Sequence, residues 1–175
     1  TLIAGFDFKY GRFGKGNVER LKQLNRFSVV KFEEVKYENK KMGSELVRDY
    51  LEAGQLDHVN NILGRFYNIT GKVVPGNKVG RAMGFKTANI NLEENYHFLR
   101  KGVYGVFVYI DKKRYLGVCN LGNNPSVNYT EKPRLEVHIF DFDEFIYDQE
   151  ISVDFVFYIR DEIRFENINQ LIEQI

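Results

Sequence analysis

The fold is decided by the stretch VYGVFVYIDKKRYLGVCNL, residues 103–121. Its two flanking runs, 103–110 and 114–121, are rich in Val, Ile, Tyr and Phe, the residues that favour β-strands. Asp111-Lys112-Lys113 between them is short and polar, as in a tight hairpin turn. The stretch therefore predicts two consecutive antiparallel strands.

The same strand signal recurs on both sides of this hairpin, mostly at short intervals set by turn residues. It covers residues 66–74, 85–92, 135–142 and 151–159. Six strands are enough to curl into a small antiparallel barrel whose interior is filled by side chains. Residues 167–175 begin with a capping Asn167 and carry an apolar stripe, which predicts a C-terminal helix lying across the barrel.

The first 64 residues have a different pattern, that of α/β architecture. An apolar strand at residues 1–6 leads into a basic glycine-rich loop, and Asn17 can cap a helix that runs through Leu24. A strand is expected at about residues 28–35. Because the chain opens in a strand without a preceding turn, we expect it to begin inside a larger domain.

Two short helices are predicted to link this segment to the barrel. Ser44 is a suitable N-cap for the first, which Gly54 ends, and the second runs from Asp57 to Leu63 with Gly64 as its stop. We therefore divide the chain into an α/β segment with two linking helices, residues 1–64, and a mainly β barrel domain, residues 65–175.

Composition narrows the possible partners and the compartment. The 175 residues include 25 Lys and Arg against 24 Asp and Glu, so a polyanion such as nucleic acid is not an expected partner. Cys119 is the single cysteine, which excludes a disulfide framework and fits a buried thiol in a reducing cytoplasm. No apolar run is long enough to span a membrane, and no leader is recognisable, so a cytoplasmic location is expected.

The segment GRAMGFKTAN, residues 80–89, carries the strongest chemical signal. Glycines such as Gly80 let backbone N–H groups approach phosphate oxygens closely. The Thr87 hydroxyl and the Asn89 carbonyl are hard, neutral oxygen ligands of the kind that Mg²⁺ accepts beside substrate phosphates. The spacing is not that of a Walker A loop. Taken alone, the segment is more typical of a glycine turn followed by a polar strand edge.

Alternation along two of the strands groups the polar candidates. Thr87 and Asn89 are two residues apart, so on a strand both side chains lie on one face and can reach one ion. On the strand at 135–142, Glu136 and His138 face away from the apolar residues between them. We interpret His138 as a neighbour of the site rather than a proton carrier. Glu136 by itself is more typical of a solvated strand glutamate.

Six pieces of the sequence have to be explained together. They are Gly71–Gly76, Gly80–Asn89, Gly102–Val106, Asn120–Ser126, Leu135–Phe142 and Tyr158–Phe165. In this order and at these separations they resemble the riboflavin kinase domain, from about Leu63 to the last residue. Upstream, Gly5–Gly11 and the segment Ser44–Arg48 resemble the second part of the FMN adenylyltransferase domain of bacterial bifunctional riboflavin kinase/FAD synthetases.

The resemblance implies a six-stranded Greek-key barrel with a C-terminal helix. It also implies a reaction in which the γ-phosphoryl group of ATP passes to the 5′-hydroxyl of riboflavin to give FMN. The small-molecule partners would be riboflavin and ATP, with Mg²⁺ bound to ATP. It implies that Thr87 and Asn89 bind Mg²⁺ and the nucleotide phosphates, and that Glu136 is the catalytic base. Phosphoryl transfer needs positioning and charge neutralisation more than covalent help, which fits so small a set of groups.

Further residues are assigned by the same resemblance. Gly76 and Gly80 would shape the loop over ATP and Arg81 would contact its phosphates, although Arg81 is as compatible with a solvated turn. The remaining positions, expected to border the flavin, are Asn124, Ser126, Arg160 and Arg164. Asn124-Pro125-Ser126 is also compatible with a simple rigid turn.

The chain departs from the family pattern in two places. Lys86 stands where the family has proline, and we expect its side chain to point away from the metal and activity to survive. The adenylyltransferase needs a paired-histidine motif, whereas His58, His97 and His138 are the only histidines here, and none is so placed. A chain with this sequence is therefore not expected to make FAD.

The alternative to a riboflavin kinase is a barrel that binds flavin or nucleotide for regulation, without catalysis.

Overall fold

The computed structural model describes residues 1–76, 86–92, 96–97, 99–122 and 134–163. Its contacts divide the chain into two compact units, residues 1–46 and 47–175. Residues 47–64 thus group with the strands that follow them, while the sequence division between residues 64 and 65 stays a prediction. The predicted C-terminal helix lies outside the described residues. Among the described residues, no helix is long and apolar enough to cross a lipid bilayer.

The first unit contains the predicted α/β segment. Strands β1 (Leu2–Gly5) and β4 (Val29–Phe32) pair in parallel, and α1 (Val18–Gln23) lies between them in sequence. The Asn17 side chain accepts a hydrogen bond from the Arg20 backbone N–H at 2.9 Å, which confirms it as the helix cap. The other elements are β2 (Lys9–Tyr10), η1 (Arg12–Gly14), β3 (Gly16–Asn17), β5 (Lys36–Tyr37) and β6 (Lys40–Lys41).

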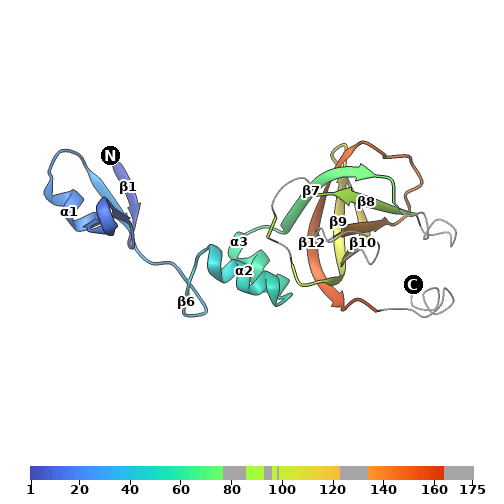
Figure 1. The fold of residues 1–175 in the computed structure, drawn as a ribbon, viewed down its shortest axis with the longest axis horizontal. Coiled ribbons are helices and arrows are strands. Elements are labelled where there is room, and N and C mark those ends of the chain that lie inside the picture. The colour runs from blue at the N-terminus through green and yellow to red at the C-terminus, as the bar shows by residue number, and fades with distance from the viewer. Residues whose placement is uncertain (77–85, 93–95, 98, 123–133, 164–175) are drawn as a thin grey trace. The chain divides into compact units, whose positions relative to one another are not determined.

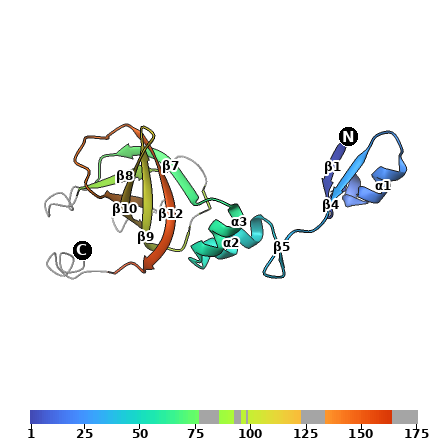
Figure 2. The same cartoon turned by 180° about the vertical axis from the view of Figure 1, so that it is seen from behind.

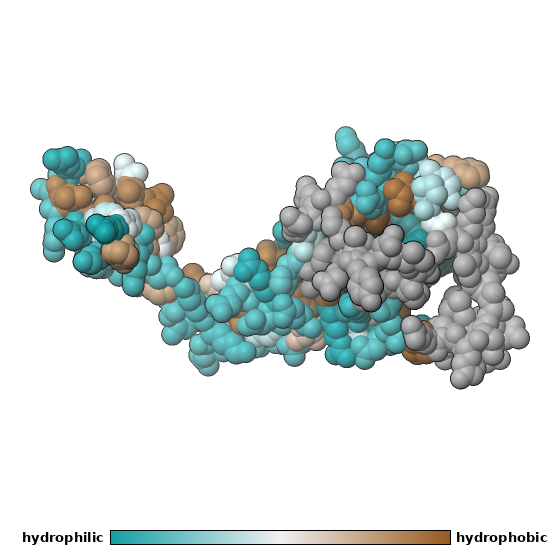
Figure 3. Space-filling view, viewed as in Figure 1, coloured by the Kyte–Doolittle hydropathy of each residue, from teal (hydrophilic) through white to brown (hydrophobic). Residues whose placement is uncertain are grey.

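One face of the parallel pair in this unit is apolar and exposed. The register sets Ile3 opposite Val30, and 68% of Ile3 and 45% of Val30 are exposed. Hydrophobic residues are visible at the surface of this unit in Figure 3. Parallel strands normally have both faces covered, so an exposed apolar face is unusual for such a pair.

Two helices follow, α2 (Ser44–Glu52) and α3 (Leu56–Leu63), and the boundary between the two units falls within α2. Gly64 ends α3 in the left-handed conformation with φ 65°, as predicted from its position. Figures 1 and 2 show α2 and α3 beside the start of β7 from opposite sides. α3 contacts β7 and β12, and the Asn60 amide donates to the Phe155 carbonyl at 3.2 Å.

Six antiparallel strands form a closed barrel in the order β10-β11-β8-β7-β12-β9. The predicted barrel is therefore confirmed. β8 lies beside β11 although two strands separate them in sequence, which is the Greek-key arrangement. The strands are β7 (Tyr67–Val74), β8 (Thr87–Asn91), β9 (Gly102–Ile110), β10 (Lys113–Gly122), β11 (Arg134–Ile139) and β12 (Glu150–Arg160).

The hairpin from which the strand prediction began is present with the expected turn. Asp111 and Lys112 both have positive φ, 45° and 68°, the backbone of the two-residue turn whose twist matches antiparallel strands. Two strand ends were predicted wrongly. β4 ends at Phe32 rather than near residue 35. β11 stops at Ile139 rather than Phe142, because the chain turns at Asp141, whose φ is 53°.

Side chains alternate along the barrel strands, and those that point inward fill the barrel interior. Tyr104 and Phe155 are fully buried and meet edge to face, with ring centroids 5.3 Å apart. Cys119 is buried, as expected from the sequence, and this burial raises the pKa of its thiol. Because residues 135, 137 and 139 point inward, their neighbours on β11 must point outward.

Two leucines of β10 test this assignment of faces. Leu121 is fully buried, so Leu121→Ala should lower the free energy of unfolding by about 2–5 kcal/mol through lost burial and a cavity. Leu116 on the same strand is 59% exposed, so Leu116→Ala should change it by less than about 0.5 kcal/mol. Urea titrations followed by tyrosine fluorescence would measure both. Equal losses would contradict the assignment.

Candidate functional site

Three of the predicted site residues, Thr87, Asn89 and Glu136, lie together on the outer face of the barrel. β11 pairs with β8 so that Glu136 is opposite Asn89 and His138 is opposite Thr87. β11 pairs on its other side with β10, which sets Asn120 opposite Glu136. Directly opposed residues share a face of the sheet, so Asn120, Glu136 and Asn89 form a row, with Thr87 and His138 alongside.

The apolar partners in the same ladder explain why this row points outward. Val137 is opposite Ala88, and Leu135 is opposite Ile90, and these residues are buried in the barrel. A shift of register by one residue would expose these four apolar side chains and bury the polar row. The predicted sharing of a face by Thr87 and Asn89, and by Glu136 and His138, is confirmed.

Asn89 lies at the base of this site. Within the described part of the chain it is the one polar residue that is buried, with 5% of its surface exposed. Its Oδ1 accepts a hydrogen bond from Arg134 Nε at 2.6 Å, as a buried amide requires. A carbonyl oxygen has two lone pairs, so Asn89 can accept this bond and still face a cation or a water.

Gly76 packs directly over this amide. A Cβ added at Gly76 would overlap the Asn89 side chain and come within 2.9 Å of Arg134 Nη2. The absence of a side chain is therefore what lets the backbone just after β7 approach the site. Gly76 thus belongs to the site for a steric reason, consistent with its predicted place.

Arg134 was missed by the sequence analysis and joins two of the predicted residues. Its Nε lies 3.1 Å from Glu136 Oε1 as well as 2.6 Å from Asn89 Oδ1. Both members of the ion pair are partly covered, with 22% of the Arg134 and 37% of the Glu136 side chain exposed. The signal was present in the sequence, because Arg134 precedes Glu136 by two and so shares its face.

His138 occupies the position expected of a neighbour. Its Nδ1 lies 2.8 Å from the Lys86 carbonyl oxygen. Because a carbonyl can only accept, Nδ1 carries the proton in this contact. The imidazole therefore fixes the backbone just before Thr87.

The segment that follows β12 reaches the same row from the other side. The Glu162 carboxylate accepts from the Asn120 amide at 3.1 Å, and a Cβ at Gly122 would overlap it. Asp161 holds the segment through two bonds from Arg100, at 3.1 and 2.8 Å, and one from the Tyr158 hydroxyl at 2.6 Å. The Tyr158 hydrogen bond, followed by Arg100, lowers the pKa of Asp161 from its ordinary value.

Arg160 is the one predicted flavin residue that the structure describes. Its Nη1 donates to the Asp161 carbonyl at 3.1 Å, and it lies two residues before Glu162. The segment that carries it is therefore linked to β10, the strand beside Glu136. Gly80, Arg81, Asn124, Ser126 and Arg164 lie outside the described residues, so their roles stay predictions.

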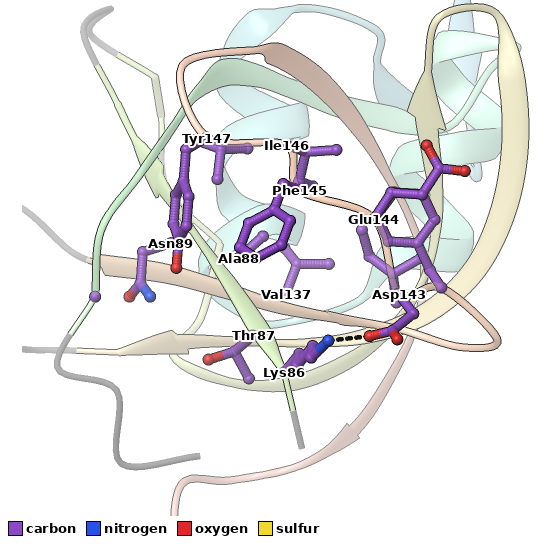
Figure 4. Close-up of a pocket in the computed structure, with 14 residues that line it drawn as sticks. Lys86, Thr87, Ala88, Asn89, Val137, Asp143, Glu144, Phe145, Ile146 and Tyr147 are labelled. Carbon is purple, nitrogen blue, oxygen red and sulfur yellow. Dashed lines mark hydrogen bonds and ion pairs between the residues drawn. The ribbon is translucent and has the colours of Figure 1, made fainter. Parts of the chain in front are cut away.

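A pocket beside β8 was not predicted. One wall is formed by Gly76, Lys86, Thr87 and Asn89 together with the inward-facing Val73, Ala88, Val137 and Ile139, and residues 142–147 of the β11–β12 connection form the other (Figure 4). Phe145 and Tyr147 bring aromatic rings to it and are 74% and 42% exposed. An exposed aromatic wall beside polar groups suits a planar ligand with a charged end.

The donors present suit a metal ion that arrives with its ligand. Among the described residues no group of three or more His, Cys, Asp or Glu is arranged to hold a metal. Thr87 Oγ1 and Asn89 Oδ1 are neutral oxygens, and Mg²⁺ commonly keeps several waters and binds through substrate phosphates. The chemistry of these two groups therefore fits Mg²⁺ delivered on a phosphate ligand.

Comparison with known proteins agrees with this arrangement. Residues 63–175 match the riboflavin kinase (flavokinase) family. The bifunctional riboflavin kinase/FMN adenylyltransferase of Bacillus subtilis is 36% identical over 177 residues, covering 99% of this chain and 56% of that protein. The protein of the same name from Buchnera aphidicola subsp. Schizaphis graminum is 38% identical over 180 residues, covering 99% of this chain and 57% of that protein.

A solved structure has the same fold. It is a crystal structure described as a macrolide-efflux protein from Streptococcus pneumoniae, with a TM-score of 0.89 and 34% identity over 98% of this chain and 57% of that one. The chain thus spans little more than half the length of the relatives it matches. The family match covers residues 63–175, which include all six barrel strands, so the chain belongs to the riboflavin kinase family.

Proposed function

We propose that this chain is an ATP-dependent riboflavin kinase that transfers the γ-phosphoryl group of ATP to the 5′-hydroxyl of riboflavin. The observation that carries the proposal is the row across β10, β11 and β8. It holds a carboxylate, Glu136, directly beside the amide of Asn89 and near the hydroxyl of Thr87. Family membership supports the substrates, riboflavin and ATP.

The nucleotide would lie on the β8 side of the row. Thr87 and Asn89 would hold the β- and γ-phosphates of Mg²⁺-ATP, with Gly76 leaving room for close approach. The magnesium ion would neutralise charge on the phosphate oxygens. The aromatic pocket formed by residues 142–147 is adjacent and suits the adenine base.

Glu136 would act on the acceptor. It accepts the proton of the riboflavin 5′-hydroxyl as that oxygen bonds to the γ-phosphorus, while the bond from phosphorus to the bridging oxygen breaks and ADP leaves with the electron pair. Arg134 would hold the carboxylate in place and offset its charge as the phosphates approach. The flavin would lie toward β10 and Arg160, with Asn124, Ser126 and Arg164 as further proposed contacts.

A wider role is proposed only for a longer protein. The two curated relatives are named as bifunctional, and this chain covers 56–57% of their length. Conversion of FMN to FAD would belong to such a full-length protein, because the paired-histidine motif is not in the present sequence.

The first test is direct formation of FMN. The purified chain is incubated with riboflavin, ATP and Mg²⁺, and the flavins are separated by chromatography. Glu136→Gln should lower kcat about 10²–10⁴-fold, the usual contribution of a positioned base, while riboflavin binding is kept. Glu150→Gln, a change of the same kind at an exposed position on β12, should leave kcat unchanged.

The outcomes separate the kinase from its rival. Flavin or nucleotide binding without any FMN would favour a non-catalytic binding barrel. Loss of turnover in Glu150→Gln equal to that in Glu136→Gln would remove Glu136 from its proposed role. Failure of the wild type to bind either ligand would contradict both readings.

The second test concerns the approach over Asn89. Gly76→Ala places a methyl group against the Asn89 amide, so the KM for ATP should rise about tenfold or more, a cost in the range of overpacking. Gly43→Ala is the matched control, because a Cβ there meets nothing within 4 Å. Steady-state kinetics at saturating riboflavin would measure both variants. An unchanged KM in Gly76→Ala would show that β7 does not crowd the nucleotide site.

A further inference from the structure

The loop between β11 and β12 crosses the pocket and is held at its two ends. At one end the Phe140 N–H donates to the Leu116 carbonyl at 2.9 Å. At the other, the Asp148 N–H donates to the Val73 carbonyl, also at 2.9 Å. Residues 142–147 between these points form the pocket wall that faces β8 (Figure 4).

Lys86 ties the middle of this loop to the opposite wall. Its Nζ forms an ion pair with Asp143 Oδ1 across the mouth of the pocket, and Figure 4 shows this side chain directed to Asp143 and away from the Thr87 hydroxyl. Its carbonyl oxygen meets His138 Nδ1 at 2.8 Å. Lys86 is thus held to β11 by its backbone and to the loop by its side chain.

The ion pair offsets negative charge at the pocket. Among the described residues that line it, Lys86 is the one cation, and Asp143 and Glu144 are the anions. A nucleotide is itself strongly anionic, so an unpaired Asp143 would add repulsion at the mouth. The pair removes that charge and draws the aromatic wall toward β8 at the same time.

We propose that the Lys86–Asp143 pair is a clasp that orders the 142–147 loop and thereby sets the affinity of the site for nucleotide. Lys86 is in this sense a positioning residue that acts through the loop. The link to nucleotide affinity rests on the proposed kinase function. The ordering of the loop does not, and it can be tested separately.

A double-mutant cycle measures the clasp. Lys86→Met, Asp143→Asn and the double variant are compared with the wild type by amide hydrogen exchange of residues 141–147 and by the KM for ATP. Each single variant should speed exchange in the loop and raise the KM about three- to fivefold, the size that an exposed ion pair can supply, with kcat unchanged. In the double variant, the increase in loop exchange and in the KM for ATP should be no larger than in either single variant.

A matched control pair lies at the base of the same loop. Lys72 Nζ and Asp148 Oδ1 are 3.1 Å apart, and these side chains are 49% and 82% exposed, against 50% and 84% for Lys86 and Asp143. Lys72→Met and Asp148→Asn should change the KM by less than about twofold, since neither residue lines the pocket. A charge swap, Lys86→Asp combined with Asp143→Lys, should restore the ion pair and with it the wild-type loop exchange and KM for ATP.

Several results would overturn the proposal. Unchanged loop exchange in both single variants would show that the pair orders nothing, whether or not the chain is a kinase. A lower KM in Asp143→Asn with a higher one in Lys86→Met would mean that Lys86 acts directly on phosphate. If the effects of the two single variants on the KM were additive, or if the control pair had equal effects, the change would come from general surface charge and not from the ion pair. Faster loop exchange in a chain that makes no FMN would keep the clasp and reject the kinase.

Discussion

Everything proposed for this chain depends on the register between β11 and its two neighbours. The backbone ladder sets Glu136 opposite Asn89 on one side and opposite Asn120 on the other. Strand side chains alternate with a period of two, so a slip of one residue would turn the whole polar row into the barrel. The inward residues Leu135 and Val137, fully buried, make such a slip costly. The hydrophobic core therefore determines the geometry of the site as well as the stability of the barrel.

The outer row is completed by contacts that a ladder alone does not supply. Arg134 bridges Asn89 and Glu136, His138 fixes the backbone before Thr87, and Glu162 reaches Asn120. Each joins residues from different strands or from the segment after the last strand. The barrel brings them together, and ion pairs and hydrogen bonds hold their orientation. A preorganised set of polar groups of this kind suits a reaction that depends on positioning.

Much of this could be predicted from sequence, because strands and their faces are encoded locally. The six strands, the hairpin at Asp111 and the faces of Thr87, Asn89 and Glu136 follow from alternation and turn residues. The end of β11 was missed because Phe140 and Phe142 continue the strand composition, while the turn depends on the backbone of Asp141. The contacts of Arg134 with Asn89 and of Lys86 with Asp143 join residues 45 and 57 apart, which no local pattern reports. Lys86 was expected to point away from the metal position, and it is directed to Asp143.

A paramagnetic ion tests the location of the phosphate site most directly. Mn²⁺ can replace Mg²⁺ on ATP, since both prefer oxygen ligands. When Mn²⁺-ATP is titrated into the isotopically labelled chain, the NMR amide signals of Thr87, Ala88, Asn89 and Glu136 should broaden first. Those of Asn68 and Ser152, on β7 and β12, should remain sharp. Broadening centred on Asn68 and Ser152, or spread evenly over the barrel, would contradict a phosphoryl-transfer site built on β8 and β11.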